Sequence, residues 1–184
     1  MIYLISYQHS GNTWFRYCIE YLTMKPTHGH QKFSISERNN NFLDIDIKAK
    51  PIAIKRHELI KNEIKNNDTF VLILRHPSSC IKVGQDVNKE FLKYYKLITE
   101  YEKFKGIKHI FYYKDLFDLS FLSNIQILDL KIIFDRLYKL YVNFEYHKEN
   151  CISIYDNERH EIGANLDIIS NKLLNNEYII NSNN

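Results

Sequence analysis

Residues 6–16 constrain the fold of this chain more than any other stretch. The residues before it, Ile2-Tyr3-Leu4-Ile5, are apolar and β-branched or aromatic, which predicts a short buried strand. After it, apolar residues recur at spacings of three and four, the pattern of a helix packed on a sheet: Trp14, Cys18, Tyr21 and Leu22. A small polar turn with one glycine joins strand and helix, so the chain begins as an α/β protein.

The polar turn is suited to binding an anion. A strand, a turn and a helix in this order point backbone N–H groups at one spot, and the helix N-terminus adds partial positive charge. Gly11 lets the backbone approach a phosphate where a Cβ would obstruct, and the hydroxyls of Ser10 and Thr13 can add donors. The turn is not a Walker P-loop, because that motif needs a Gly-Lys pair that is missing here.

The turn resembles the phosphosulfate-binding loop of the sulfotransferases that use PAPS (3′-phosphoadenosine 5′-phosphosulfate), which reads roughly Tyr-Pro-Lys-Ser-Gly-Thr/Asn-Thr-Trp. The matching residues are Tyr7, Ser10, Gly11, Asn12, Thr13 and Trp14. Gln8 replaces the proline, and His9 replaces a lysine that contacts the phosphosulfate bridge; a histidine is fully charged only when protonated. The resemblance implies that residues 10–13 hold the 5′-phosphate, that Trp14 stacks on adenine and that His9 lies near the bridge.

A candidate catalytic histidine follows the second predicted strand, at residues 51–54. In open α/β sheets, functional side chains gather just beyond the carboxyl ends of parallel strands. Lys55-Arg56-His57 resembles the sulfotransferase sequence Lys-Thr-His, whose histidine is the general base. The resemblance implies that His57 takes the acceptor proton, which an imidazole with a pKa near ~6.5 can do at neutral pH. Lys55 and His9 would neutralise charge on the bridging and sulfuryl oxygens.

A candidate phosphate-binding arginine follows the third predicted strand, at residues 69–74, whose apolar run is typical of a central parallel strand. Arg75-His76-Pro77 resembles the family's Arg-Asp-Pro, with His76 in place of aspartate. The resemblance implies that Arg75 binds the 3′-phosphate, and its planar guanidinium can engage two phosphate oxygens at once. Val83 stands where the family has a serine, so that contact is missing or has moved.

The rest of the chain is less informative. A fourth strand is predicted at residues 109–113, and Tyr113, Asp115 and Leu116 resemble the family's Tyr-Glu-Asp-Leu, whose tyrosine lies near the adenine. Helices with a packing role are predicted at residues 58–66, 86–105 and 125–144, and residues 25–50 form a long loop with a short helix or strand in it. The segment from Arg159 to Gly163 is a weak counterpart of the family's C-terminal phosphate-binding segment, and residues 178–184 are predicted to fray.

Composition sets the class of partner and the compartment. At 184 residues the chain fits one domain, and 25 Lys+Arg against 22 Asp+Glu leave a net charge of +3, too little to predict nucleic-acid binding. The three cysteines are far apart in the sequence, which favours a reducing compartment, and His28 and His30 have no third ligand nearby, so no metal site is predicted. No stretch has the length of a membrane span or the pattern of a signal peptide, so a cytoplasmic protein is predicted.

These patterns predict a three-layer α/β sandwich whose central parallel sheet is flanked by helices, with P-loop-like sulfotransferase architecture. The predicted activity is transfer of the sulfuryl group from PAPS to a hydroxyl or amine of a small-molecule or glycan acceptor, releasing PAP, without a metal. A divergent nucleotide kinase or other phosphotransferase is a second possibility. A catalytically inactive module that binds PAP or a sulfated ligand is a third. The acceptor and the oligomeric state are left open.

Overall fold

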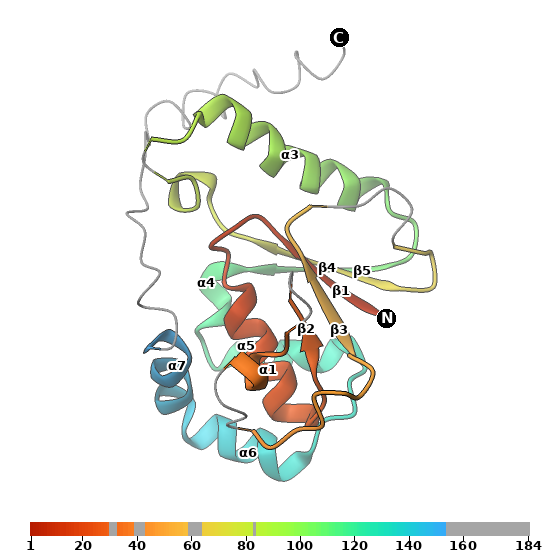
Figure 1. The fold of residues 1–184 in the computed structure, drawn as a ribbon, viewed down its shortest axis with the longest axis vertical. Helices are drawn as coiled ribbons and strands as arrows, with labels where there is room; N and C mark the ends of the chain where they lie inside the picture. Colours follow the sequence, from red (N-terminus) through yellow and green to blue (C-terminus); the bar gives the residue numbers. More distant parts are fainter. Residues whose placement is uncertain (30–32, 39–42, 59–63, 83, 154–184) are drawn as a thin grey trace.

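Figure 1 shows the protein as a computed structural model, which describes residues 1–29, 33–38, 43–58, 64–82 and 84–153. Strands and helices alternate along much of the chain. In order, the elements are β1 (Ile2–Ser6), α1 (Asn12–Thr23), β2 (Thr27–His28), α2 (Ile35–Arg38), β3 (Ala53–Arg56), β4 (Thr69–Leu74), η1 (Pro77–Ser79), α3 (Val87–Lys103), β5 (Ile107–Tyr112), α4 (Tyr113–Leu116), α5 (Ser120–Asn124), η2 (Ile125–Leu128), α6 (Phe134–Val142) and α7 (Phe144–Ser153).

The strands form one five-stranded sheet in the order β2-β3-β1-β4-β5, and all neighbouring strands are parallel. β1 lies in the middle, and all of its residues are buried. Both faces of a central parallel strand are covered, which is why β1 and β4 read as continuous apolar runs in the sequence.

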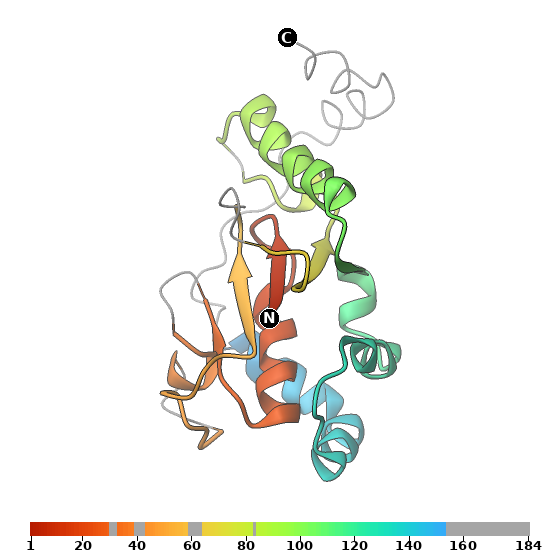
Figure 2. The same ribbon diagram turned by 90° about the vertical axis from the view of Figure 1, so that its right-hand side faces the viewer.

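Helices cover both faces of the sheet. Side chains alternate along β1, so that Ile2 and Leu4 pack in a core with α1, α5, α6 and α7, whereas Tyr3 and Ile5 pack in a second core with α3. Figures 1 and 2 show α3 on one side of the sheet and α1 on the other. The predicted three-layer arrangement with a parallel sheet is confirmed.

The sheet agrees closely with the sequence predictions. β4 has the predicted bounds, and β3 lies two residues further along the chain than predicted. β5 ends at Tyr112, so that Tyr113 opens α4 rather than closing the strand. α3 begins after Asp86, whose side chain accepts hydrogen bonds from the N–H groups of Asn88 and Lys89, an N-cap that fixes the start of the helix.

The single helix predicted at residues 125–144 is wrong. η2 ends at Leu128, because Asp129 adopts a left-handed conformation with φ of 50°, and α6 begins only at Phe134. The N–H of Ile133 donates to the carbonyl of Leu22, 2.9 Å away, so the segment between the two helices is bonded to the end of α1. Apolar periodicity predicted helical residues here but not the interruption.

The predicted long loop at residues 25–50 contains β2 and α2, which are attached to α1 by a buried ion pair. Arg16 is 2% exposed and Glu20 is 0% exposed, and their side chains lie 3.9 Å apart. Arg16 donates to the hydroxyl of Thr27 at 2.7 Å. Glu20 accepts from the N–H groups of Ile35 and Ser36 at the start of α2, each at 2.9 Å. These bonds compensate the cost of burying both charges.

Several predictions concern residues outside the described ranges: His30, residues 59–63 of the predicted second helix, Val83, the Arg159–Gly163 segment, and residues 178–184. Among the residues that the structure describes, no helix is both long and apolar enough to cross a membrane.

Candidate functional site

The carboxyl ends of four adjacent strands place the predicted site residues along one edge of the sheet. Ile5 of β1 is level with Arg56 of β3, so His57 follows close to Ser6. On the other side of β1, Ser6 is level with Ile73 of β4, which places Arg75 beside the β1–α1 turn. Leu74 of β4 is level with Tyr112, which precedes Tyr113. A parallel sheet brings together residues that are more than 100 positions apart in the sequence.

The β1–α1 turn (residues 7–11) has a tight backbone that requires glycine at one position. Gly11, the N-cap of α1, has φ of 81°, and a Cβ added there would lie 2.7 Å from Leu116 Cδ1 and 3.1 Å from Tyr113 Cδ2. No acidic residue lies in the first turn of α1, and no side chain caps it. The N-terminal N–H groups of the helix therefore keep their partial positive charge, as an anion site requires.

Polar side chains of the turn and of the first turn of α1 make contacts within the protein. Ser10 is 1% exposed, and its hydroxyl lies 3.6 Å from the sulfur of Cys80. The amide of Asn12 donates to the carbonyl of Leu4 and the hydroxyl of Ser6, each at 3.1 Å, so it braces α1 against β1. Thr13 is half-buried in the first turn of α1. In this arrangement, the backbone N–H groups are the main donors that the turn offers to an anion.

Trp14 is part of the core. It is 3% exposed, and its indole N–H donates to the carbonyl of Leu116 at 2.7 Å. Its ring stacks with those of Tyr17 and Phe117 and meets Phe144 edge-on. Stacking of adenine on Trp14 stays a prediction that this packing does not favour, because the ring is covered.

Arg75 contacts both Tyr113 and His9, a residue of the β1–α1 turn. The guanidinium of Arg75 donates to the carbonyl oxygen of His9 at 2.7 Å, and its Cζ lies 4.0 Å from the centre of the Tyr113 ring. A guanidinium over an aromatic face is held by cation–π attraction and stacking. His9 itself has φ of 60°, and its Nε2 atom is buried, so that nitrogen would have to turn outward to contact a ligand.

His57 is attached to the strand that leads into the turn. Its Nδ1 atom lies 2.8 Å from the carbonyl oxygen of Ser6. Because a carbonyl oxygen can only accept, Nδ1 carries the hydrogen and Nε2 of the neutral ring carries the lone pair. Lys55, two residues earlier on β3, is half-buried and level with Leu4 of β1.

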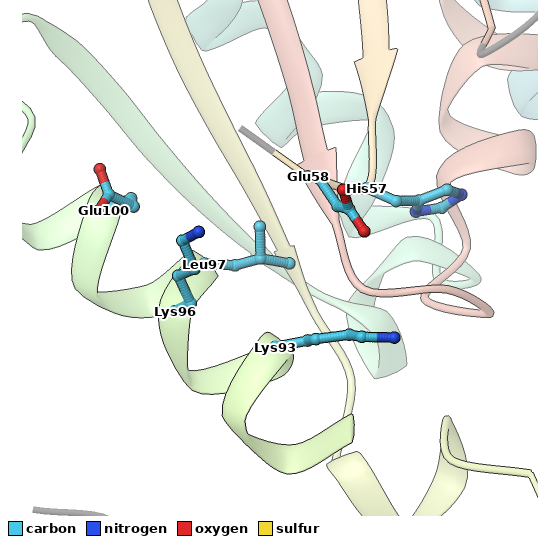
Figure 3. Close-up of a pocket in the computed structure, with 6 residues that line it drawn as sticks. All are labelled: His57, Glu58, Lys93, Lys96, Leu97 and Glu100. Atoms are coloured by element: carbon cyan, nitrogen blue, oxygen red, sulfur yellow. The ribbon is translucent and has the colours of Figure 1, made fainter. Parts of the chain in front are cut away.

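A pocket of roughly 200 Å³ lies beside His57, between the end of β3 and α3. Figure 3 shows its lining residues: His57, Glu58, Lys93, Lys96, Leu97 and Glu100. Five of these six side chains are charged or titratable and Leu97 is aliphatic, so the pocket offers a ligand both charged groups and apolar surface. The sequence predicted α3 only as a covering helix with a solvated charged face, and nothing in its pattern singled out the pocket-lining lysines.

No group of three or more His, Cys, Asp or Glu side chains is placed to bind a metal ion in the described part of the chain. The candidate site consists of the β1–α1 turn with Arg75, Tyr113 and His57 around it.

The five-stranded parallel sheet flanked by helices has a known counterpart: the protein has a sulfotransferase-like fold. The crystal structure of mouse sulfotransferase SULT7A1 complexed with PAP is similar over 91% of this chain and 72% of that chain, with a TM-score of 0.50 and 14% sequence identity. At that identity the similarity concerns the fold. No protein-family model matches the sequence, and no curated protein does either.

Proposed function

We propose that the protein is a sulfotransferase that moves the sulfuryl group of PAPS to a hydroxyl or amine of a small-molecule or glycan acceptor and releases PAP. The hydrogen bond between His57 and Ser6 carries this proposal, because it places a candidate general base beside the turn that would hold the 5′-phosphate. The similar fold of a sulfotransferase crystallised with PAP supports it.

The residues around the turn fit an adenosine bisphosphate. The N-terminus of α1, whose first turn has no acidic residue, suits a phosphate. Arg75 is the candidate ligand for the 3′-phosphate, since its guanidinium is hydrogen-bonded to the turn at His9. Tyr113 lies next to both Gly11 and Arg75, so its ring is better placed than that of Trp14 to contact the adenosine.

The reaction requires proton removal and charge stabilisation. The acceptor oxygen or nitrogen forms a bond to sulfur while the bond from sulfur to the phosphate oxygen of PAPS breaks, and PAP leaves with the electron pair. Nε2 of His57 takes the acceptor proton and later passes it to solvent. His9 and Lys55 would stabilise negative charge on the bridging and sulfuryl oxygens. As in phosphoryl transfer, positioning and electrostatics supply most of the acceleration.

The acceptor would enter through the pocket beside His57. The charged groups and the apolar surface of that pocket together suit an acceptor that has both polar and apolar parts. Neither a nucleic acid nor a membrane is needed as partner for this reaction.

Ligand-dependent thermal unfolding tests the proposal before any acceptor is known. PAP, which would bind only the folded protein, should raise the melting temperature, by an amount equivalent to ~2.7 kcal/mol at 100 times its Kd. ATP with Mg²⁺ is the matched control. A shift with ATP and Mg²⁺ but not with PAP would overturn the proposal in favour of a phosphotransferase. PAP binding without transfer of labelled sulfate to any of a broad panel of acceptors would point to an inactive binding module.

A further inference from the structure

A chain of two hydrogen bonds runs from the anion-binding turn to the pocket. The hydroxyl of Tyr7, the first residue of the turn, donates to Glu90 Oε2 at 2.5 Å. The other carboxylate oxygen of Glu90 accepts from Lys93 Nζ at 2.7 Å. Tyr7 and Glu90 are 83 positions apart in sequence, and both are buried. The bonds therefore connect the N-terminal turn to α3 through the interior of the protein.

The carboxylate in this chain is ionised. Burial acts to raise the pKa of Glu90, but the hydrogen bonds from Lys93 and Tyr7 outweigh burial and leave the pKa below its usual value. The hydrogen bond from Lys93 to Glu90 raises the pKa of Lys93. The negative charge of Glu58 across the pocket raises this pKa further. Lys93 is therefore charged at neutral pH, and we call its ammonium, which is hydrogen-bonded to Glu90, the held ammonium.

The held ammonium lies in the wall of the pocket that contains His57. Its side chain is 45% exposed, and Figure 3 shows it extending from α3 toward the strand ends that carry His57 and Glu58. An ammonium has three N–H donors, and Glu90 takes one of them, so donors are left for a ligand in the pocket.

We propose that Lys93 binds the oxygens of the sulfuryl group during transfer, and that Glu90 and Tyr7 are positioning residues that hold its ammonium there. This inference rests on the proposed function. The hydrogen bonds from Lys93 to Glu90 and from Tyr7 to Glu90 connect the ammonium to the turn that would hold the 5′-phosphate. Lys93 and His57, the candidate base, line the same pocket. Lys93 exchanges no proton in the step; it stabilises negative charge on the sulfuryl oxygens.

The affinity of PAPS relative to PAP measures this contact without an acceptor, since the two nucleotides differ only in the sulfuryl group. In the full-length protein, Lys93→Met should weaken PAPS by about tenfold, the usual effect of losing one hydrogen bond to a charged group, and change PAP by less than about twofold. Tyr7→Phe and Glu90→Gln should lower the same ratio by less. A purely structural role would lower the melting temperature without changing the ratio.

Lys89→Met is the matched control, because Lys89 is an exposed lysine of α3 that does not line the pocket. It should leave the PAPS-to-PAP ratio unchanged. If the unmodified protein binds PAP but Lys93→Met leaves the PAPS-to-PAP ratio unchanged, the role of Lys93 is refuted and the proposed function is not. If the unmodified protein binds neither nucleotide, the proposed function is wrong and the inference falls with it.

Discussion

The Nδ1 atom of His57 lies 2.8 Å from the carbonyl oxygen of Ser6, the last residue of β1. This hydrogen bond joins the end of β3 to the start of the β1–α1 turn and fixes which imidazole nitrogen carries the lone pair. Because the carbonyl belongs to the backbone of β1, the position of His57 depends on the register of two parallel strands.

Substitution of His57 should abolish turnover while leaving nucleotide binding nearly intact. His57→Asn keeps an amide that can donate to Ser6 but has no basic nitrogen, whereas His57→Ala loses both functions. Both variants should lower the rate of sulfate transfer by about 10²- to 10⁴-fold, the usual contribution of a general base. Single-turnover transfer and calorimetric titration with PAP measure the two effects, and a normal rate in His57→Asn would contradict the assignment.

Arg75→Ala should weaken PAP by about 10- to 100-fold, because charge-assisted bonds to the 3′-phosphate are lost. Arg75→Lys should recover only part of the affinity, since an ammonium cannot replace the planar guanidinium that stacks on Tyr113. Titration with 5′-AMP is the control, because it has no 3′-phosphate. Equal losses for PAP and 5′-AMP would show that Arg75 acts through its bond to His9 and not through the 3′-phosphate.

Gly11→Ala should destabilise the protein more than Gly84→Ala. Both glycines have positive φ, 81° and 82°, so both substitutions strain the backbone by about 1–2 kcal/mol. At Gly11 the new Cβ would lie 2.7 Å from Leu116, whereas no atom of the described residues lies within 4 Å of the corresponding position at Gly84. Urea unfolding should give about 1–3 kcal/mol of additional loss for Gly11→Ala. Equal losses would mean that the turn can move away from Leu116.

His147 should make the fold less stable in mild acid. It is 8% exposed, its Nδ1 lies 2.7 Å from the hydroxyl of Tyr17, and burial lowers its pKa. The unfolded chain, with a histidine pKa near ~6.5, then binds the proton more readily than the folded protein does. This contribution to stability is complete above that pH and is lost as the pH falls toward the lowered folded pKa.

The variant His147→Gln cannot be protonated and should have a flatter dependence of unfolding free energy on pH below ~6.5. The contribution of Glu90, whose pKa is also lowered, is lost only at more acidic pH, below ~4.3, so the two effects separate. The same slope in His147→Gln as in the unmodified protein would contradict the prediction.

The sequence predicted the parts of the fold that repeat a local pattern. β4 is apolar throughout because both faces of the sheet are covered, and its predicted bounds were correct. The gathering of residues 9–11, His57, Arg75 and Tyr113 followed from the rule that parallel strands end at one edge of a sheet. Their roles in binding and catalysis stay predictions.

What the sequence did not reveal depends on contacts between distant residues. β2 has two residues, too few for a pattern, and it is held by Arg16 and Glu20, two charged residues that periodicity alone would assign to the surface. Trp14 matched a family motif, yet the rings around it come from α1, α7 and the segment between α4 and α5. The bond from Tyr7 to Glu90 likewise has no local signal.

The buried ion pair of α1 has a consequence for how the chain assembles. Until β2 and α2 dock, Arg16 and Glu20 face water, and docking must precede or accompany their burial. The residues that bond to Glu20 follow it in the sequence by at most 16 positions. Closing the loops between them therefore costs less entropy than closing the longer loop between β1 and β4. We therefore expect the first 36 residues to form contacts early in folding, with Thr27→Val slowing refolding more than it speeds unfolding.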